Sequence, residues 1–319
     1  MEEKKAIDLS IDFCGVRFKN PILVASGTFG YGSEASEFCD INGLGGIVTK
    51  SVSWKPRPGN IPTRIVETAS GMINSIGLAN VGVHKFVEEK LPYLAEFDTN
   101  IIANIAASSI EEYCNVLEHI EAHSTRNLVG YEINVSCPNV KDGGLSFGTN
   151  PKMIEDLTKA LRPLTKKMLI IKLTPNVTSV APFAKTCEDS GADAISLINT
   201  VVAMAVDVYT HKPRISTITG GLSGPAIRPI AIAKVYEARK SCSLPIIGIG
   251  GIVSAMDMME FFIVGASLVQ IGTYNFVNPN AGNDLAEDLK DILLGENVTK
   301  MSEVVGTLEV PEEMRALGW

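Results

Sequence analysis

Short apolar runs rich in β-branched residues recur along the chain and alternate with longer segments of helical spacing. The runs predict buried strands at residues 22–25, 46–49, 101–105, 128–135, 168–173, 194–198, 245–249 and 267–271. Helical spacing fills most of the intervals, for example residues 84–97, 109–123, 151–164, 180–190, 225–240 and 255–264. Eight strand-then-helix units in succession predict a closed TIM (β/α)8 barrel of the α/β class, with an open two-layer α/β sheet as the alternative.

Three segments depart from this alternation. Residues 7–20 alternate apolar and polar positions around Cys14-Gly15, which predicts a β-hairpin that covers the bottom of the barrel. Residues 50–82 and 199–224 are too long for simple turns, and both follow strands, so we expect functional loops at the C-terminal face. No linker or low-complexity tract divides the chain, and residues 1–319 are predicted to form a single domain.

The composition excludes several classes of function. The chain has 319 residues, of which 45% are hydrophobic and 20% charged, as is typical of a globular protein. The net charge of −8 argues against a nucleic-acid surface, and no apolar run is long enough to span a membrane. The N-terminus, Met1 to Lys5, leads into alternating strand sequence rather than a signal peptide. We therefore expect a cytoplasmic protein.

The cysteines and histidines do not predict a metal centre. The six cysteines are widely spaced and show no C-x-x-C pair, so neither a zinc site nor an iron–sulfur cluster is indicated, and free thiols are expected. His119 and His123 are four residues apart, but two ligands alone make a poor metal site. A solvated helix face is the simpler interpretation, and no resident metal is expected.

Candidate chemistry gathers where the predicted strand 128–135 ends. Pro138 stops the strand, because proline cannot donate to the ladder and restricts the residue before it. Cys137 therefore stands at a C-terminal strand end with Asn134 and Asn139 beside it, where (β/α)8 barrels carry their active sites. A buried structural cysteine is the alternative, but its setting favours a reactive thiol. The glycine-rich residues 139–150 predict a lid over a substrate.

Polar residues also follow the other predicted strands. They include Ser26, Lys50, Ser51, Asn104, Asn199 and Thr200. Lys172 lies within an apolar run, and a buried cation requires an anionic partner, either an internal carboxylate or a ligand. Since Lys50 and Lys172 fall on the same face of the predicted barrel, we expect bound anions there.

Glycines after the last two strands suggest a phosphate site. Gly250-Gly251 and Gly272-Thr273 can present backbone N–H groups, and phosphate sites recur at these two loops of barrel enzymes. Tight turns are the alternative. No G-x-G-x-x-G follows a first strand, so an NAD-binding Rossmann fold is not indicated. FMN suits a barrel mouth, and Lys172 could then lie near the pyrimidine edge of its ring.

Six motifs together resemble the class 1 dihydroorotate dehydrogenases. They are the N-x-S-C-P-N signature at 134–139, Lys50-Ser51, residues 71–78, Asn199-Thr200, residues 219–225 and residues 248–251. The likeness runs from about Ile7 to Gly272 in family order. Residues 141–148, K-D-G-G-L-S-F-G, resemble the loop of the NAD-linked class 1B catalytic subunits rather than that of the fumarate-linked class 1A.

The resemblance implies roles for individual residues. Cys137 would be the catalytic base that takes a proton from C5 of (S)-dihydroorotate while a hydride leaves C6 for FMN. The substrate would be held by Lys50, Asn74, Ser75, Ile76, Gly77, Leu78, Asn134, Asn139, Asn199 and Thr200. The flavin would be contacted by Ser26, Lys50, Ser51, Asn104, Asn134, Lys172, Ile198, Gly224, Gly250, Gly251, Gly272 and Thr273.

The class 1B likeness also implies a partner. A separate subunit would carry FAD and a 2Fe-2S cluster and pass electrons to NAD+, in the synthesis of pyrimidines. This chain would bind FMN alone and form a homodimer within a heterotetramer. Three alternatives stay open, namely a dihydropyrimidine dehydrogenase-like barrel, a stand-alone class 1A enzyme and a non-catalytic flavin-binding barrel. Substrate and electron acceptor distinguish the first two, and flavin reduction by dihydroorotate excludes the third.

Overall fold

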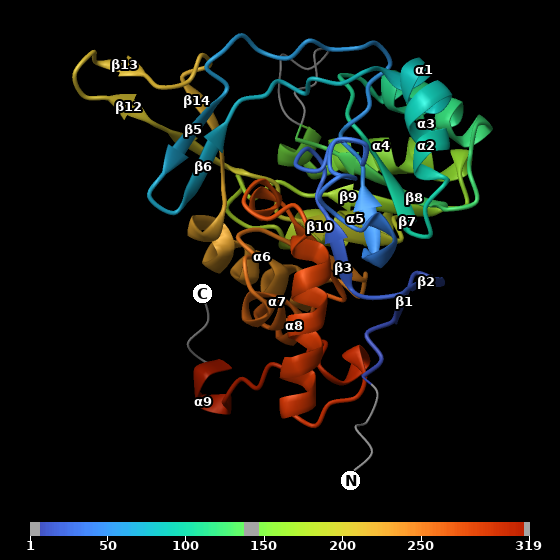
Figure 1. Ribbon diagram of the computed structural model, residues 1–319, viewed down its shortest axis with the longest axis vertical. Helices are drawn as coiled ribbons and strands as arrows, with labels where there is room; N and C mark the ends of the chain where they lie inside the picture. Colours follow the sequence, from blue (N-terminus) through green and yellow to red (C-terminus); the bar gives the residue numbers. More distant parts are fainter. Residues whose placement is uncertain (1–6, 137–146, 316–319) are drawn as a thin grey trace.

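The core of the structure, a computed structural model that describes residues 7–136 and 147–315, is a closed barrel of parallel strands (Figure 1). Its strands are β3 (Ile22–Val24), β4 (Gly46–Val48), β7 (Asn100–Ile105), β8 (Leu128–Asn134), β9 (Met168–Lys172), β10 (Ala194–Leu197), β15 (Ile246–Ile249) and β16 (Leu268–Ile271). Each pairs with the next in this order, and β16 closes onto β3. The predicted (β/α)8 barrel is confirmed.

Helices surround the barrel, and several begin at a side-chain cap. They are α1 (Val83–Lys85), α2 (Leu91–Leu94), α3 (Ile110–Ala122), α4 (Pro151–Leu161), α5 (Ala181–Asp189), α6 (Arg228–Ser241), α7 (Ala255–Ile263), α8 (Ala281–Gly295) and α9 (Glu312–Arg315). Ser109 caps α3, and Ser254 forms a reciprocal capping box with Asp257 at α7. The helix predicted at 84–97 is divided by a π-helical turn, Phe86–Lys90, and α8 was not among the predicted helices.

The lower half of the barrel interior is apolar. Strand residues from all around the barrel meet there, namely Leu23, Val48, Ile102, Met168, Ile170, Ala194, Ile247 and Leu268. The hairpin of β1 (Ile11–Phe13) and β2 (Val16–Phe18) adds Phe13 and Phe18, whose rings meet edge to face at 6.1 Å. The hairpin therefore covers the bottom of the barrel, as predicted from its alternating pattern.

The interior becomes polar one step higher. Because side chains two residues apart point to the same face of a strand, the residues above the apolar layer also face inward. On four strands they are polar and buried, namely Asn104, Lys172, Ser196 and Gln270, and Glu132 of β8 lies among them. The strand sequences thus change from apolar to polar toward the C-terminal face, where the site lies.

The two long intervals of the chain join in one sheet above the barrel mouth. The first contains β5 (Ile65–Thr68) and β6 (Gly71–Asn74), and the second contains β11 (Val201–Met204) and β14 (Thr219–Ser223). The order is β11-β14-β6-β5, with Gly221 opposite Asn74. A Cβ at Gly221 would lie 2.0 Å from Thr200 Oγ1, so only glycine permits this approach.

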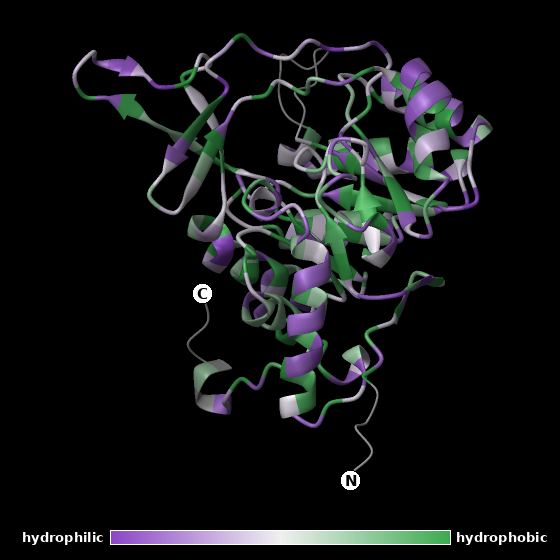
Figure 2. Cartoon of the chain, viewed as in Figure 1, coloured by the Kyte–Doolittle hydropathy of each residue, from purple (hydrophilic) through white to green (hydrophobic). Residues whose placement is uncertain are grey.

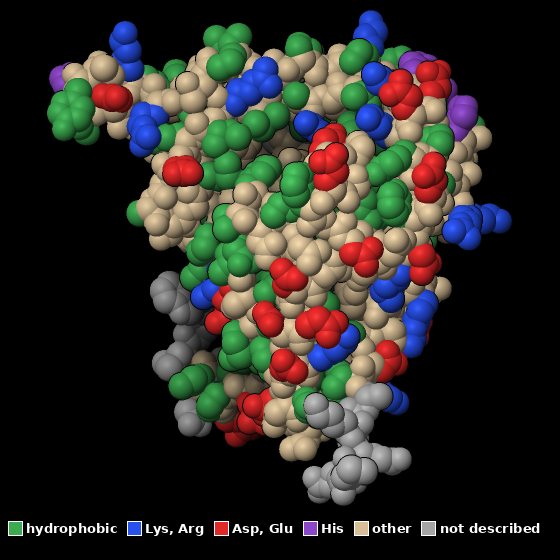
Figure 3. Space-filling model, viewed as in Figure 1, with side chains coloured by type: hydrophobic (Ala, Val, Ile, Leu, Met, Phe, Trp, Pro, Cys, Tyr) green, Lys and Arg blue, Asp and Glu red, His purple; other side chains and the backbone are tan. Residues whose placement is uncertain are grey.

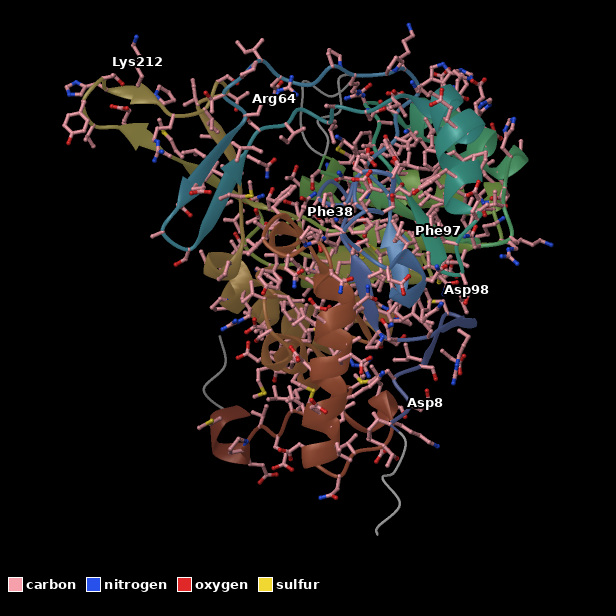
Figure 4. All side chains as sticks on the ribbon, viewed as in Figure 1. Asp8, Phe38, Arg64, Phe97, Asp98 and Lys212 are labelled. Carbon is pink, nitrogen blue, oxygen red and sulfur yellow. The ribbon has the colours of Figure 1, made fainter. Side chains whose placement is uncertain are left out.

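A narrow arm extends from this sheet. It consists of β12 (Val206–Asp207) and β13 (Lys212–Pro213), and Figure 4 shows Lys212 pointing away from the barrel. Val208 and Tyr209 are largely exposed at its end, where Figure 3 shows an apolar group.

Hydropathy follows the architecture. Figure 2 shows hydrophobic residues concentrated in the central strands and hydrophilic ones along the outer side of α8. Among the described residues, no helix is long and apolar enough to cross a membrane, and no cluster of side chains could hold a metal ion. The five described cysteines carry free thiols.

Candidate active site

A cavity of about 510 Å³ opens at the C-terminal ends of the barrel strands, beneath the sheet of β6 and β14. Most of the predicted site residues line it. They are Ser26, Lys50, Ser51, Asn74, Ser75, Ile76, Gly77, Leu78, Asn134, Lys172, Ile198, Asn199, Thr200, Gly224, Gly250, Gly251, Gly272 and Thr273. The fold thus brings together residues from all parts of the chain between positions 26 and 273, in a volume ordinary for a cofactor site.

Among the described residues, one predicted site residue, Asn104, does not line this cavity. Asn104 is fully buried, and its side chain accepts a hydrogen bond from Ser51 and donates one to Glu132. Asn104 is therefore connected to the cavity by way of Ser51, which lines it. Its direct contact with a cofactor remains a prediction. Cys137 and Asn139 lie outside the described residues, as does most of the predicted lid.

A group of polar side chains joins the ends of β8 and β10. Asn199 Nδ2 donates to Asn134 Oδ1 at 3.1 Å and to Ser136 Oγ at 2.8 Å. The backbone N–H groups of Ser136 and Thr200 in turn donate to Asn134 Oδ1 and Asn199 Oδ1. The carboxamides are thereby held in fixed orientations, which suits recognition of a ring edge that carries both donors and acceptors.

The end of β6 and the segment that follows it line another part of the cavity. Asn74 Nδ2 donates to the carbonyl of Gly221 at 3.2 Å, which fixes Asn74 against β14. Ser75 is held by its backbone N–H, which donates to Arg64 O at 2.7 Å. The Oγ of Ser75 is buried and has no hydrogen-bond partner among the described residues, although the residue lines the cavity. A buried hydroxyl left unpaired in a cavity favours a polar ligand there.

The two lysines of the wall have different electrostatic settings. Within the described residues, no carboxylate forms an ion pair with Lys50, so its ammonium is available to an anionic ligand. Lys172 Nζ lies 3.1 Å from Glu132 Oε1, and both side chains are buried. The anionic partner that the sequence required for Lys172 is therefore internal, while Lys172 also lines the cavity.

The glycines form a close-fitting cradle. Gly224 and Gly251 have φ values of +95° and +70°, which side-chain-bearing residues rarely adopt. A Cβ at Gly251 would lie 2.8 Å from the carbonyl oxygen of Gly224. At Gly272, by contrast, a Cβ would meet only Ala25 at 3.8 Å, so the cavity side is open. Backbone exposed in this way fits close approach of a phosphate group.

Sequence reasoning missed several residues of the site. Ser136 and Ser223 line the cavity, and Ser223 Oγ accepts a hydrogen bond from Thr273 Oγ1 at 2.7 Å. Glu132 was given no role, although a carboxylate inside an apolar strand is as unusual as the lysine in β9 that drew attention. That shared anomaly was the signal that could have found it.

The fold and the site together define a (β/α)8-barrel protein with a ligand cavity at the C-terminal strand ends, the usual place of barrel active sites. The family model for dihydroorotate dehydrogenase matches residues 8–293. The chain belongs to the dihydroorotate dehydrogenase family, which confirms the resemblance seen in its motifs.

Relatives narrow the comparison within the family. The chain is 47% identical over 302 residues to the dihydroorotate dehydrogenase B (NAD(+)) catalytic subunit of Pelobacter propionicus, covering 95% of this chain and 99% of that protein. It is 48% identical over 301 residues to the subunit of the same name from Thermodesulfovibrio yellowstonii, covering 94% and 99%. The predicted likeness to NAD-linked class 1B catalytic subunits is thus confirmed.

A solved structure supports the fold independently. The DHODH of Eimeria tenella in complex with ferulenol superposes with a TM-score of 0.79 over 96% of this chain and 90% of that one, at 20% sequence identity. At this identity the likeness concerns the fold alone.

Proposed function

We propose that the chain oxidises (S)-dihydroorotate to orotate with FMN, and that the electrons pass to NAD+ through a partner subunit. One observation carries the proposal, namely that the lysine, carboxamide and glycine positions of the family motifs converge on a single cavity. The names of the relatives, which are NAD+-linked catalytic subunits, support the acceptor and the need for a partner. The reaction belongs to pyrimidine synthesis.

The residues present fit FMN. Gly250, Gly251, Gly272 and Thr273 would hold the phosphate, because their strand ends carry exposed backbone and a hydroxyl. Residues at or after the ends of other strands would line the ring, namely Ser26, Ser51, Ile198 and Lys172. When bound, FMN would supply the acceptor for a hydride.

Substrate recognition would rest on charge and on carboxamides. Lys50 would attract the carboxylate of dihydroorotate to the junction of substrate and flavin, since within the described residues no carboxylate competes for its ammonium. Asn74, Asn134 and Asn199 would hydrogen-bond the ring, because each carboxamide offers a donor and an acceptor. The unpaired Ser75 Oγ adds one further polar contact.

Proton removal is assigned to Cys137. The described chain ends beside it at Ser136, which lines the cavity and accepts from Asn199. A thiol with an ordinary pKa of about 8.5 can serve as a base near neutral pH when its surroundings favour the thiolate. The sequence position, directly after Ser136, supports this role.

The partner subunit would dock beside the cavity. Phe276 lines the cavity rim yet is 57% exposed, and its neighbour Val277 is 77% exposed. An exposed apolar pair at the mouth of a cofactor site suits a subunit that must bring its own redox centre close. We propose that this subunit carries FAD and a 2Fe-2S cluster, and that two catalytic chains form the centre of a heterotetramer.

Steady-state NADH formation tests the two-subunit arrangement. The isolated, FMN-loaded chain should transfer electrons from dihydroorotate to an artificial dye but not efficiently to NAD+. Addition of an FAD- and cluster-bearing subunit should restore NADH formation, and the mass of the complex should correspond to two of each chain. Efficient NAD+ reduction by the chain alone would contradict the arrangement, and efficient fumarate reduction would indicate a class 1A enzyme.

A further inference from the structure

Glu132 is a fully buried carboxylate whose two oxygens receive hydrogen bonds from four other barrel strands. Oε1 accepts from Asn104 Nδ2 at 2.7 Å and from Lys172 Nζ at 3.1 Å. Oε2 accepts from Ser196 Oγ at 2.9 Å and from Gln270 Nε2 at 2.7 Å. Glu132 itself does not line the cavity.

Packing alone does not explain this cluster. The apolar layer from Leu23 to Leu268 already fills the barrel directly below it. A buried ion pair is weak evidence for stability, because well-packed apolar residues often serve as well. Such a pair is more informative when one of its members reaches a ligand site, and Lys172 lines the cavity.

The carboxylate controls the cavity floor at two points. It holds the ammonium of Lys172 directly. It also holds Asn104, whose Oδ1 accepts from Ser51 Oγ at 2.6 Å, and Ser51 lines the cavity. In the strand register, Asn104 lies beside Glu132, and Lys172 lies beside both Asn134 and Ser196. The positions of two floor groups on different strands thus depend on one carboxylate.

We propose that Glu132 is a positioning residue for the bound flavin. Glu132 fixes the ammonium of Lys172 at the cavity floor and offsets its charge there. The inference rests on the proposed function, because it takes FMN to be the ligand of the cavity. The carboxylate lies behind the ammonium as seen from the cavity, so its charge reduces the net positive potential that the floor presents. Since reduced FMN carries the added electrons, this potential sets how much more tightly reduced FMN binds than oxidised FMN.

The test measures the dissociation constants of oxidised and reduced FMN, without dihydroorotate, and takes their ratio. Glu132→Gln keeps the shape of the side chain and removes its charge. The preference for reduced FMN should rise about tenfold, the size expected for one charge near a partly desolvated site. Glu132→Asp keeps the charge and should stay within about threefold of the wild type. An unchanged or lower preference in Glu132→Gln would overturn the proposal.

A matched control separates the effect of Glu132 on Lys172 from a general loss of stability around Glu132. Ser196→Ala removes a donor from the oxygen of Glu132 that faces away from Lys172, so it should lower thermal stability yet leave the FMN preference unchanged. A shift in Ser196→Ala as large as that in Glu132→Gln would show that the effect is merely structural and overturn the proposal.

A second variant tests the proposal if Glu132→Gln does not fold. Glu132→Gln combined with Lys172→Met leaves no unpaired buried charge. Because the ammonium lies nearer the cavity than the carboxylate, removing both should lower the preference for reduced FMN about tenfold. An unchanged preference would overturn the proposal. A wild-type chain that binds no FMN would instead contradict the proposed function.

Discussion

The carboxamide of Asn199 donates to the hydroxyl of Ser136 across 2.8 Å, and this contact ties the end of β10 to the last described residue before Cys137. The same nitrogen donates to Asn134 Oδ1, so one amide orients two residues at the end of β8. The chain beyond β8 therefore starts from a position that β10 helps to define. If Cys137 is the base and Asn199 binds the substrate, as predicted, Asn199 would act on the base through Ser136 and on the substrate directly.

Replacement of Asn199 by aspartate should impair turnover without unfolding the protein. The side chain keeps its size but can no longer donate to Ser136 and Asn134, and its charge repels Asn134 Oδ1. We expect kcat/KM for dihydroorotate to fall about 10- to 100-fold, the usual cost of an unpaired polar group. Steady-state kinetics with a dye acceptor measures this. Wild-type kcat/KM in the variant would show that the contact has no part in catalysis.

Replacement of Cys137 by alanine should leave FMN bound and remove proton abstraction. We expect reduction of the flavin by dihydroorotate to slow by about 10² to 10⁴, the usual contribution of a positioned base. Cys137→Ser should keep part of the activity, with an optimum at higher pH, because a hydroxyl loses its proton less readily than a thiol. Rapid-mixing absorbance measures both variants. Near wild-type reduction in Cys137→Ala would assign the base elsewhere.

The glycine cradle can be tested with a matched pair of substitutions. Gly251 and Gly15 both have positive φ, +70° and +78°, but a Cβ at Gly251 meets Gly224 and Arg228 at 2.8 Å, whereas a Cβ at Gly15 has nothing within 4 Å. Gly15→Ala should cost about 1 kcal/mol of unfolding free energy from backbone strain alone. Gly251→Ala should cost more, roughly 2–4 kcal/mol, because overpacking adds to that strain.

Denaturant unfolding and FMN titration check this pair. Gly251→Ala should also weaken FMN binding, because the cradle must shift, while Gly15→Ala should bind FMN as the wild type does. Equal FMN affinity in both variants would show that the loop after β15 does not hold the cofactor.

A histidine cluster predicts a decline of stability at acidic pH. The ring centroids of His84 and His119 lie 4.7 Å apart, and those of His119 and His123 lie 4.8 Å apart. Trp54 packs against His84 and His119. Burial, followed by the charges of its two histidine neighbours, lowers the pKa of His119 from its ordinary value of 6.5, although Glu88 opposes the shift. The unfolded chain therefore binds a proton more readily than the folded one, and stability falls as the pH drops below 6.5.

Thermal unfolding between neutral and mildly acidic pH measures this dependence. His119→Asn should flatten it, while His211→Asn, at an exposed position on the arm, should not. An equal pH dependence in wild type and His119→Asn would show that His119 does not contribute.

The local sequence pattern was sufficient to predict the barrel, but it did not predict which distant strands pair. Strand residues from Ile22 to Ile271 fell where apolar runs predicted, because a parallel strand buried on both faces is mostly apolar. The pairing of β6 with β14 could not be foreseen, since it joins intervals more than a hundred residues apart. The glycines that permit it, such as Gly221, resemble ordinary turn residues in sequence.

The site was predictable at strand ends and less so within strands. Lys50, Asn134 and Asn199 were found because polar residues after buried strands are conspicuous. The partner of Lys172 was not found, because its identity depends on the register between β8 and β9. A strand end alone does not reveal that Asn104 bonds Ser51, which lines the cavity, so the predicted contact of Asn104 with a cofactor stays a prediction.

Anaerobic mixing of the purified, FMN-loaded chain with dihydroorotate tests the central claim most directly. The absorbance of oxidised flavin should decrease after mixing, and orotate should form in an amount equal to the FMN present. No partner subunit should be required. Dihydrouracil, which lacks the carboxylate that Lys50 is proposed to bind, should bleach the flavin far more slowly. A flavin that stays oxidised with dihydroorotate, in a chain that holds FMN, would contradict the proposed function.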